Sequence, residues 1–205
     1  LVDNGDAAGA RESLDRLAAG ADADGQVLVE AARVHVLVGD LDGAKTLLDR
    51  AETTTTAPRW QIARERGRLA LRQRSFPVAI EALERAASLQ PTDGETRLLL
   101  IDAHLARQDA TAAHKVLDDV LKRFAGMPEA QLATGRVRLY ADAIDEARDA
   151  FVKAKDQLER AHAAPRWIAD ATYWLARTTY YGGDPVRARA LVAQAVGLDP
   201  SLADA

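Results

Sequence analysis

Small and large apolar residues recur along the chain at a helical spacing. An alanine appears at six positions that lie 34, 35, 34, 34 and 41 residues apart, and apolar residues follow each alanine after four and after seven positions. Offsets of four and seven residues lie on one face of an α-helix. The alanines are Ala10, Ala44, Ala79, Ala113, Ala147 and Ala188; the residues four later are Leu14, Leu48, Leu83, Leu117, Phe151 and Val192; those seven later are Leu17, Ala51, Ala86, Val120, Ala154 and Ala195. The pattern predicts one amphipathic helix per copy, with small side chains where it packs closely on its neighbours.

A second, mostly small position precedes each of the last five alanines by twelve residues. It is occupied by Ala32, Gly67, Ile101, Gly135 and Ala176. We predict that a first helix crosses the second helix of each copy closely at this position, although isoleucine is large for such a crossing.

Turn-like segments separate the two expected helices. Gly39 and Gly183 can adopt the left-handed conformation that ends a helix. The side chains that we expect to cap the following helix are Asp40, Ser75, Asp109 and Asp184. The unit is therefore a helix-turn-helix of about 34 residues.

These residues together resemble the tetratricopeptide repeat. The resemblance implies an all-α fold, a right-handed α-solenoid of antiparallel helix pairs, and it covers nearly the whole chain. We predict a single domain over residues 1–205, with a lone helix at 6–19 followed by five full repeats at 25–59, 60–93, 94–127, 128–168 and 169–202. The tryptophan and tyrosine that are usual in the first helix are mostly missing, so related solenoids with looser motifs remain the alternative.

The longest interval, 41 residues, falls at the end of the array. Seven extra residues are nearly two helical turns. We therefore predict one long helix over 144–162, with Pro165 in the first turn of the next helix. The tetrapeptide at 57–60, Ala-Pro-Arg-Trp, recurs at 164–167; we interpret it as a repeated helix start, with a tryptophan contact for a partner as the alternative.

The composition excludes several classes of function and adds little to the prediction of the fold. Aromatic residues make up 5% of the chain, the net charge is −4, and there is no cysteine, which excludes disulfides and thiolate chemistry. No run of about 18 apolar residues is present to span a membrane. The chain opens with Leu1 and without a leader, so we expect a piece of a longer protein, and the compartment, cytoplasmic or periplasmic, stays undecided. Its alanine and arginine usage suggests a bacterial source.

The resemblance places a binding groove on the first helices of the repeats. In this family the ninth repeat position faces the groove, and in four of the five repeats that position is an arginine. The predicted groove residues are Arg33, Arg64, Arg68, Arg72, Arg136, Tyr140, Tyr173, Arg177, Tyr180 and Tyr181. Arginine recognises carboxylates and phosphates, and tyrosine adds rigid contact area. The alternative is that these arginines pair, on a solvated face, with the acidic neighbours Glu65, Glu95, Asp102 and Asp170.

Three functions follow from these residues. The first is a protein-interaction scaffold whose groove binds a peptide with acidic and apolar residues. The second is a structural module that self-associates through apolar edges, for which the candidates are Leu14, Leu17, Leu191 and Leu198. The third, an arginine groove that binds nucleic-acid phosphates, is disfavoured by the acidic balance of the chain.

Catalysis, cofactors and metals have no motif in this sequence. His35 and His104 occupy one repeat position, where the family packs an aromatic ring, and we assign both to the core. No histidine pair has the spacing of a zinc site, and no glycine-rich phosphate loop is present. The run of threonines at 53–56 is interpreted as a polar loop, with phosphorylation as the alternative. We expect no enzyme, no cofactor and no metal.

Overall fold

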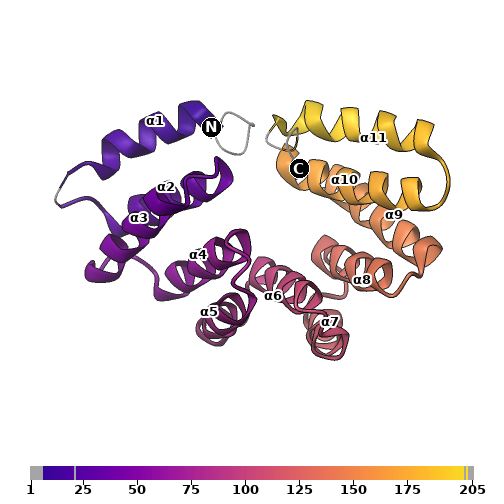
Figure 1. Ribbon diagram of the computed structural model, residues 1–205, viewed down its shortest axis with the longest axis horizontal. Coiled ribbons are helices and arrows are strands. Elements are labelled where there is room, and N and C mark those ends of the chain that lie inside the picture. The colour runs from indigo at the N-terminus through magenta and orange to yellow at the C-terminus, as the bar shows by residue number, and fades with distance from the viewer. Residues whose placement is uncertain (1–6, 21, 201, 203–205) are drawn as a thin grey trace. The chain divides into compact units, whose positions relative to one another are not determined.

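The computed structural model describes residues 7–20, 22–200 and 202. The other positions, among them the first residue of the lone helix expected from residue 6, lie outside the described residues. In the described part the chain forms eleven α-helices and no β-strand (Figure 1). The all-α fold is therefore confirmed.

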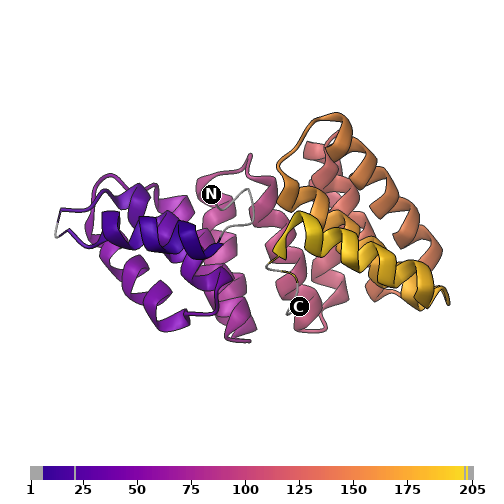
Figure 2. The ribbon, with the colours of Figure 1, turned by 90° about the horizontal axis from the view of Figure 1, so that it is seen from above.

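The helices fall into two compact units. The N-terminal unit, up to Arg107, holds α1 (Ala7–Ala18), α2 (Gly25–Leu37), α3 (Leu41–Thr53), α4 (Arg59–Arg72), α5 (Phe76–Leu89) and α6 (Gly94–Ala106). The C-terminal unit, from Gln108, holds α7 (Ala110–Phe124), α8 (Pro128–Tyr140), α9 (Ile144–Arg160), α10 (Pro165–Tyr181) and α11 (Pro185–Leu198). Within each unit consecutive helices pack on one another (Figure 2). The repeat boundaries and the organisation as one domain stay predictions.

First helices also contact one another inside each unit. In the N-terminal unit α4 packs against both α2 and α6, and in the C-terminal unit α8 contacts α10. A side chain on one first helix can therefore reach the start of the next. This packing positions the arginines that the sequence singled out.

The apolar pattern matches the cores of both units. All six recurring alanines are buried, and the large residues Leu48, Leu83 and Phe151 are fully buried. Three members of the predicted face are not fully buried: Leu14 is partly buried, the side chain of Leu17 is 63% exposed, and Val192 is exposed as well. Leu17 and Val192 lie on the first and the last described helix, which pack mainly on α2 and on α10 respectively. A helix with a neighbour on one side can bury only part of its apolar stripe.

The predicted close crossings are present. A Cβ atom built on Gly67 would lie 2.5 Å from Cγ of Leu83, and one built on Gly135 would lie 2.5 Å from Cε1 of Phe151. Glycine at these positions therefore lets the second helix bring a large side chain against the backbone of the first. Ile101, which fitted this position poorly, is fully buried.

The turns follow the prediction with one correction. Gly39 and Gly183 have φ angles of 82° and 87°. The carboxylates of Asp40, Asp109 and Asp184 accept hydrogen bonds from backbone N–H groups three residues later, at 2.9–3.0 Å. Ser75 makes no such side-chain bond, so its predicted capping role is wrong; Pro77 lacks one of the two N–H groups that a cap at this position bonds.

The two longest helices of the described chain lie next to each other near its C-terminal end. α9 and α10 each have 17 residues, and Pro165 begins α10. The long helix predicted from residue 144 ends at Arg160, two residues early. The two Ala-Pro-Arg-Trp segments both lie at helix starts, those of α4 and α10, as the repeated-start interpretation predicted.

Candidate functional site

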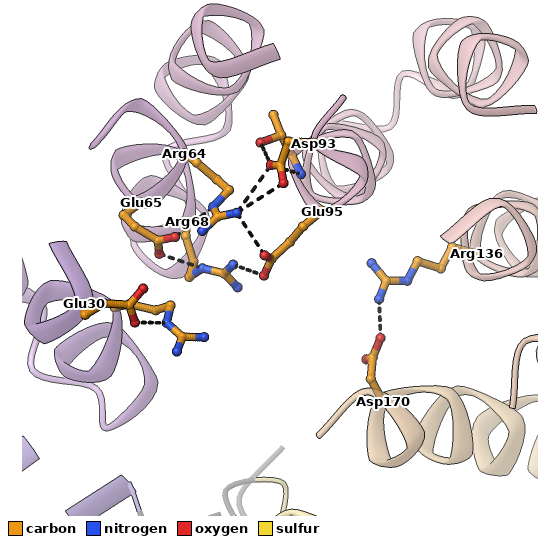
Figure 3. Close-up of polar contacts among 10 residues, drawn as sticks. Glu30, Arg64, Glu65, Arg68, Asp93, Glu95, Arg136 and Asp170 are labelled. Carbon is orange, nitrogen blue, oxygen red and sulfur yellow. Dashed lines mark hydrogen bonds and ion pairs between the residues drawn. The ribbon is translucent and has the colours of Figure 1, made fainter. Parts of the chain in front are cut away.

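Arginines of α4 are bound by carboxylates in the N-terminal unit (Figure 3). Nε of Arg64 lies 3.0 Å from Oε1 of Glu65, and Nε of Arg68 lies 2.9 Å from Oε2 of the same glutamate. Both guanidinium groups then reach Glu95 at the start of α6: Nη1 of Arg64 at 3.0 Å from Oε2, and Nη2 of Arg68 at 2.6 Å from Oε1. Arg64 Nη1 also lies 3.4 Å from the nearest carboxylate oxygen of Asp93. We call these five residues the α4–α6 ion cluster.

The α4–α6 ion cluster is buried at its centre. Glu65 is 0% exposed and Arg64 is buried. Burial alone lowers the pKa of each arginine, but the nearby carboxylates outweigh it and raise the pKa: Glu95 first for Arg64, and Glu65 first for Arg68. Both arginines therefore stay charged, and their charge is matched inside the protein.

The other two predicted residues of this unit differ in exposure: the side chain of Arg33 is 12% exposed, whereas Arg72 is exposed. Nε of Arg33 on α2 bonds Oε2 of Glu30 at 3.0 Å within the same helix. Arg72 at the end of α4 is exposed. It makes no ion pair with any residue that the structure describes.

In the C-terminal unit two of the predicted arginines contact the same tryptophan. Nη2 of Arg136 on α8 lies 2.8 Å from Oδ2 of Asp170 on α10 (Figure 3). The indole of Trp174 donates a hydrogen bond to the other oxygen of Asp170 at 3.0 Å. The guanidinium carbons of Arg136 and Arg177 lie 5.0 Å and 4.7 Å from the centroid of the Trp174 ring, within the range of cation–π attraction. We call these four residues the α8–α10 tryptophan cluster.

Tyrosines border this cluster along the chain of α10. The ring of Tyr173 lies edge-on to Trp174, with the two ring centroids 6.1 Å apart. Tyr180 and Tyr181, which contact each other edge-to-face at 5.8 Å, are 62% and 56% exposed. Tyr140 at the end of α8 is also exposed. The C-terminal unit thus presents large amphipathic rings to solvent.

Two family models match the chain. Both are described as Tetratricopeptide repeat, and they match residues 29–94 and 70–137, which together span more than half of the chain. The chain belongs to the tetratricopeptide repeat family. Repeats of this family generally mediate protein–protein interaction and are typically non-catalytic.

Several solved structures have a fold similar to that of this chain. A tetratricopeptide repeat protein from Parabacteroides merdae is 18% identical, with a TM-score of 0.61 over 98% of this chain and 78% of its own. BtubC (BKLC) from P. vanneervenii is 17% identical, with a TM-score of 0.56 over 94% and 87% of the two chains. The TPR-like repeats of a putative kinesin light chain from Podosopora anserina are 18% identical, with a TM-score of 0.53 over 84% and 93%. No curated protein sequence matches the chain.

Repeat positions explain where the arginines of this tetratricopeptide protein point. Arg68 and Arg136 occupy the ninth position of their predicted repeats, and their partners Glu95 and Asp170 occupy the second position of the repeats that follow. Each pair therefore joins neighbouring first helices within a unit. Arginine at position nine followed by an acid at position two of the next repeat is a signal that the sequence already carried.

The pairing with acidic neighbours is present in the described residues. Glu65, Glu95 and Asp170 bind arginines as that alternative predicted, and Asp93, which it did not name, joins them. The expectation of a solvated face is wrong for Arg64, Glu65 and Arg136, because these side chains are buried.

His35 and His104 are both buried, which fits their assignment to the core. Within the described ranges no group of three or more histidines and carboxylates is placed to hold a metal ion. Nor is any helix of the described chain both long and apolar enough to cross a membrane.

Proposed function

We propose that this protein is a protein-interaction scaffold whose main binding surface is the α8–α10 face of the C-terminal unit. The observation that carries the proposal is the exposure of Tyr180 and Tyr181 on the helix that also carries Arg177. Arg177 contacts Trp174 through its guanidinium group but forms no ion pair with a described residue. A cation and exposed rings on one helix are typical of binding surfaces.

The chemistry of this face defines the partner that we propose. Tyrosine rings bury apolar area at a small cost in conformational entropy, and arginine binds a carboxylate through two parallel hydrogen bonds. The partner segment is therefore one that carries acidic and apolar side chains. Arg136 shapes the surface through Trp174, and Tyr140 and Tyr173 extend it.

The N-terminal unit contributes less charge to such a surface. The α4–α6 ion cluster already matches Arg64 and Arg68 with carboxylates, and Arg33 is paired with Glu30. Removing a paired arginine from its carboxylates to serve a partner would leave buried charges without partners. Of the four predicted residues in this unit, Arg72 is the one that we propose for direct contact.

Selection from a displayed peptide library tests this proposal. The 205-residue chain is the bait, and selected peptides are expected to be enriched in Asp, Glu and apolar residues. Titration calorimetry then compares a selected peptide on the wild type, on the double variant Tyr180→Ala/Tyr181→Ala, and on Arg177→Gln. We expect the affinity to fall at least about tenfold for each variant, because surface anchors of this kind carry most of the binding energy.

A matched control uses another exposed helix of the same unit. The double variant Val152→Ala/Lys153→Ala changes exposed residues of α9 and should bind the peptide like the wild type. Peptides that bind both double variants equally well would place the binding surface elsewhere.

Self-association is the second function that a specific observation favours. Leu17 on α1 and Val186 on α11 are strongly exposed apolar side chains on the first and the last described helix. Exposed apolar faces of this kind are covered in many proteins by contacts between molecules. Sedimentation velocity at tens of micromolar tests this function: a concentration-dependent dimer that Leu17→Ser weakens would support it, and a monomer at every concentration would remove it.

A further inference from the structure

Helix α1 buries little apolar surface on the N-terminal unit. Among its described side chains the buried ones are the small Ala10 and Ala18, while Leu14 is only partly buried and Leu17 is exposed. Because an alanine side chain removes little apolar area from water, this packing stabilises the docked helix only weakly. α1 can therefore leave the unit at a smaller cost than a helix that buries several large side chains.

Polar contacts fix the position of α1. Nη2 of Arg11 lies 2.7 Å from Oδ2 of Asp40, the residue that caps α3. Nε2 of His35 on α2 lies 2.7 Å from Oδ1 of Asp15, and Nδ1 of the same ring lies 3.0 Å from Oδ2 of Asp40. These contacts join side chains of α1 to two neighbouring elements, so they specify which face of the helix lies on α2.

Arg50 on α3 binds the C-terminal end of α1. Its Nη1 donates to the carbonyl oxygen of Ala18 at 2.8 Å, and its Nη2 donates to that of Gly20 at 2.7 Å. The last carbonyl groups of a helix have no partner within the helix, and a cation near them is favourable. The unit thus recognises both the side chains and the end of α1. We call the surface formed by His35, Asp40 and Arg50 the α1 site.

An exposed segment connects α1 to α2. The two helices are joined by residues 19–24, and Ala19, Asp22 and Asp24 in this segment are exposed. A change in the backbone path of an exposed connection disturbs little packing. The segment can therefore lead α1 onto its own α2 or toward another molecule.

We propose that α1 is an exchangeable helix, and that the α1 site of one molecule accepts α1 of a second copy, so that two copies form a reciprocal dimer. The α1 site defines this occupant: Asp40 takes the cation of Arg11, His35 contacts the carboxylate of Asp15, and Arg50 takes the carbonyl groups at the helix end. The same helix from a second copy satisfies every one of these contacts. Exchange of an identical element between copies is a low-cost route to a dimer.

The connection sets the concentration at which exchange occurs. A short linker holds its own helix at an effective concentration of about 1 mM. Exchange should therefore be rare at micromolar concentration in the wild type and should become common near about 1 mM. This dimer differs from association through the exposed Leu17, because it uses the face of α1 that is already docked. Every test below is made in the Leu17→Ser variant, which removes that other contact.

Deletion of residues 19–23 tests the proposal. Asp24 alone then joins α1 to α2, whereas antiparallel helix pairs are joined by about two to five residues, so α1 can dock only on a second copy. Sedimentation velocity should show a dimer whose dissociation constant is at least about 100-fold lower than without the deletion, since the competing tethered helix is gone. Hydrogen exchange should show that α1 stays protected. A monomer at about 10 µM, or a dimer with an unprotected α1, would overturn the proposal.

A substitution in the α1 site separates this dimer from other associations. Arg50→Gln in the deletion variant removes charged donors from the helix end and should raise the dissociation constant at least about tenfold. Arg66→Gln is the matched control: Arg66 on α4 pairs with Asp49 and Glu52 of α3, and its loss should change the dissociation constant by no more than about twofold. Equal dissociation constants for the two substitutions would show that the dimer forms without the α1 site.

A second measurement covers the case in which the deletion variant does not fold. Isotope-labelled and unlabelled chains of full length are mixed and kept at about 1 mM, the effective concentration of the tethered helix. Isotope-filtered NMR should then show contacts between Leu14 of one copy and the α2–α3 core of the other, against which Leu14 packs. If all contacts of Leu14 stayed within one copy, the helix would not exchange and the proposal would be wrong.

Discussion

The α4–α6 ion cluster and the α8–α10 tryptophan cluster each contain an arginine at the ninth repeat position, but the side chains around that arginine differ. Arg68 and Arg136 both lie at the ninth position of a first helix, and both reach an acid on the next first helix of their unit. Arg68 is surrounded by carboxylates, with Glu65 fully buried beneath it. Arg136 pairs with the carboxylate of Asp170, which also accepts a hydrogen bond from the indole of Trp174.

The difference shows that an arginine column is not by itself a binding surface. Buried carboxylates bind the guanidinium groups of α4 and make them part of the structure, because an isolated charge is costly to bury. In the C-terminal unit, the guanidinium groups of Arg136 and Arg177 lie over the ring of Trp174, and Arg136 pairs with a partly exposed aspartate. The two regions differ in the side chains that surround the arginines, and not in the arginines themselves.

Glu65→Gln should cause the largest loss of stability among the variants that test this difference. The substitution removes the buried carboxylate that Arg64 and Arg68 share, and we expect it to lower the free energy of unfolding by about 3–5 kcal/mol. Urea unfolding followed by circular dichroism measures the change. Glu84→Gln, on the exposed face of α5, is the control and should stay within about 0.5 kcal/mol of the wild type.

Asp170→Asn should have a smaller effect. Its side chain is 30% exposed, so water screens its ion pair, and the amide oxygen of asparagine can still accept a hydrogen bond. We expect a loss of about 1–2 kcal/mol in the free energy of unfolding, in the range of a hydrogen bond to a charged group. If this variant lost more stability than Glu65→Gln, the distinction between a fully buried and a partly exposed carboxylate would be wrong.

Acid should weaken the N-terminal unit through carboxylates outside its ion cluster. Hydrogen bonds from the Gly43 N–H to Asp40, and from Lys45 and then Arg66 to Asp49, lower the pKa of each carboxyl from its ordinary value of 3.8. Their contribution to stability is present above that value and is lost as the pH falls through the lowered pKa. Hydrogen exchange of α2 and α3 between pH 5 and pH 3 should show this loss. Asp40→Asn should make the loss smaller, and this change in stability should be smaller than the loss of stability caused by Glu65→Gln.

Tyr180→Ala/Tyr181→Ala should leave stability almost unchanged. Both rings are more than half exposed, and exposed substitutions change the free energy of unfolding by no more than about 0.5 kcal/mol each. Thermal unfolding by circular dichroism tests this expectation. A large loss would mean that the rings support the fold, and they would then be poor candidates for a binding surface.

The sequence predicted the fold in detail and the candidate site only in outline. The spacing of Ala79 and Leu83 is enough to place a helix and its buried face, because helical geometry repeats locally. The pairing of Arg68 with Glu95 was open to prediction from their repeat positions. The burial of Glu65 could not be predicted in this way. A charged side chain is expected to face solvent, and a shift of one residue along the helix would have placed it there.

The sequence by itself determined the helices, most of their caps and the small residues at their crossings, because each depends on residues a few positions apart. The tertiary structure decided which charges are buried, which arginines carry a matched charge, and that His35 bridges Asp15 and Asp40. These contacts join residues up to 34 positions apart, and their energies depend on burial and on neighbouring charges. Both quantities exist only once the helices have packed.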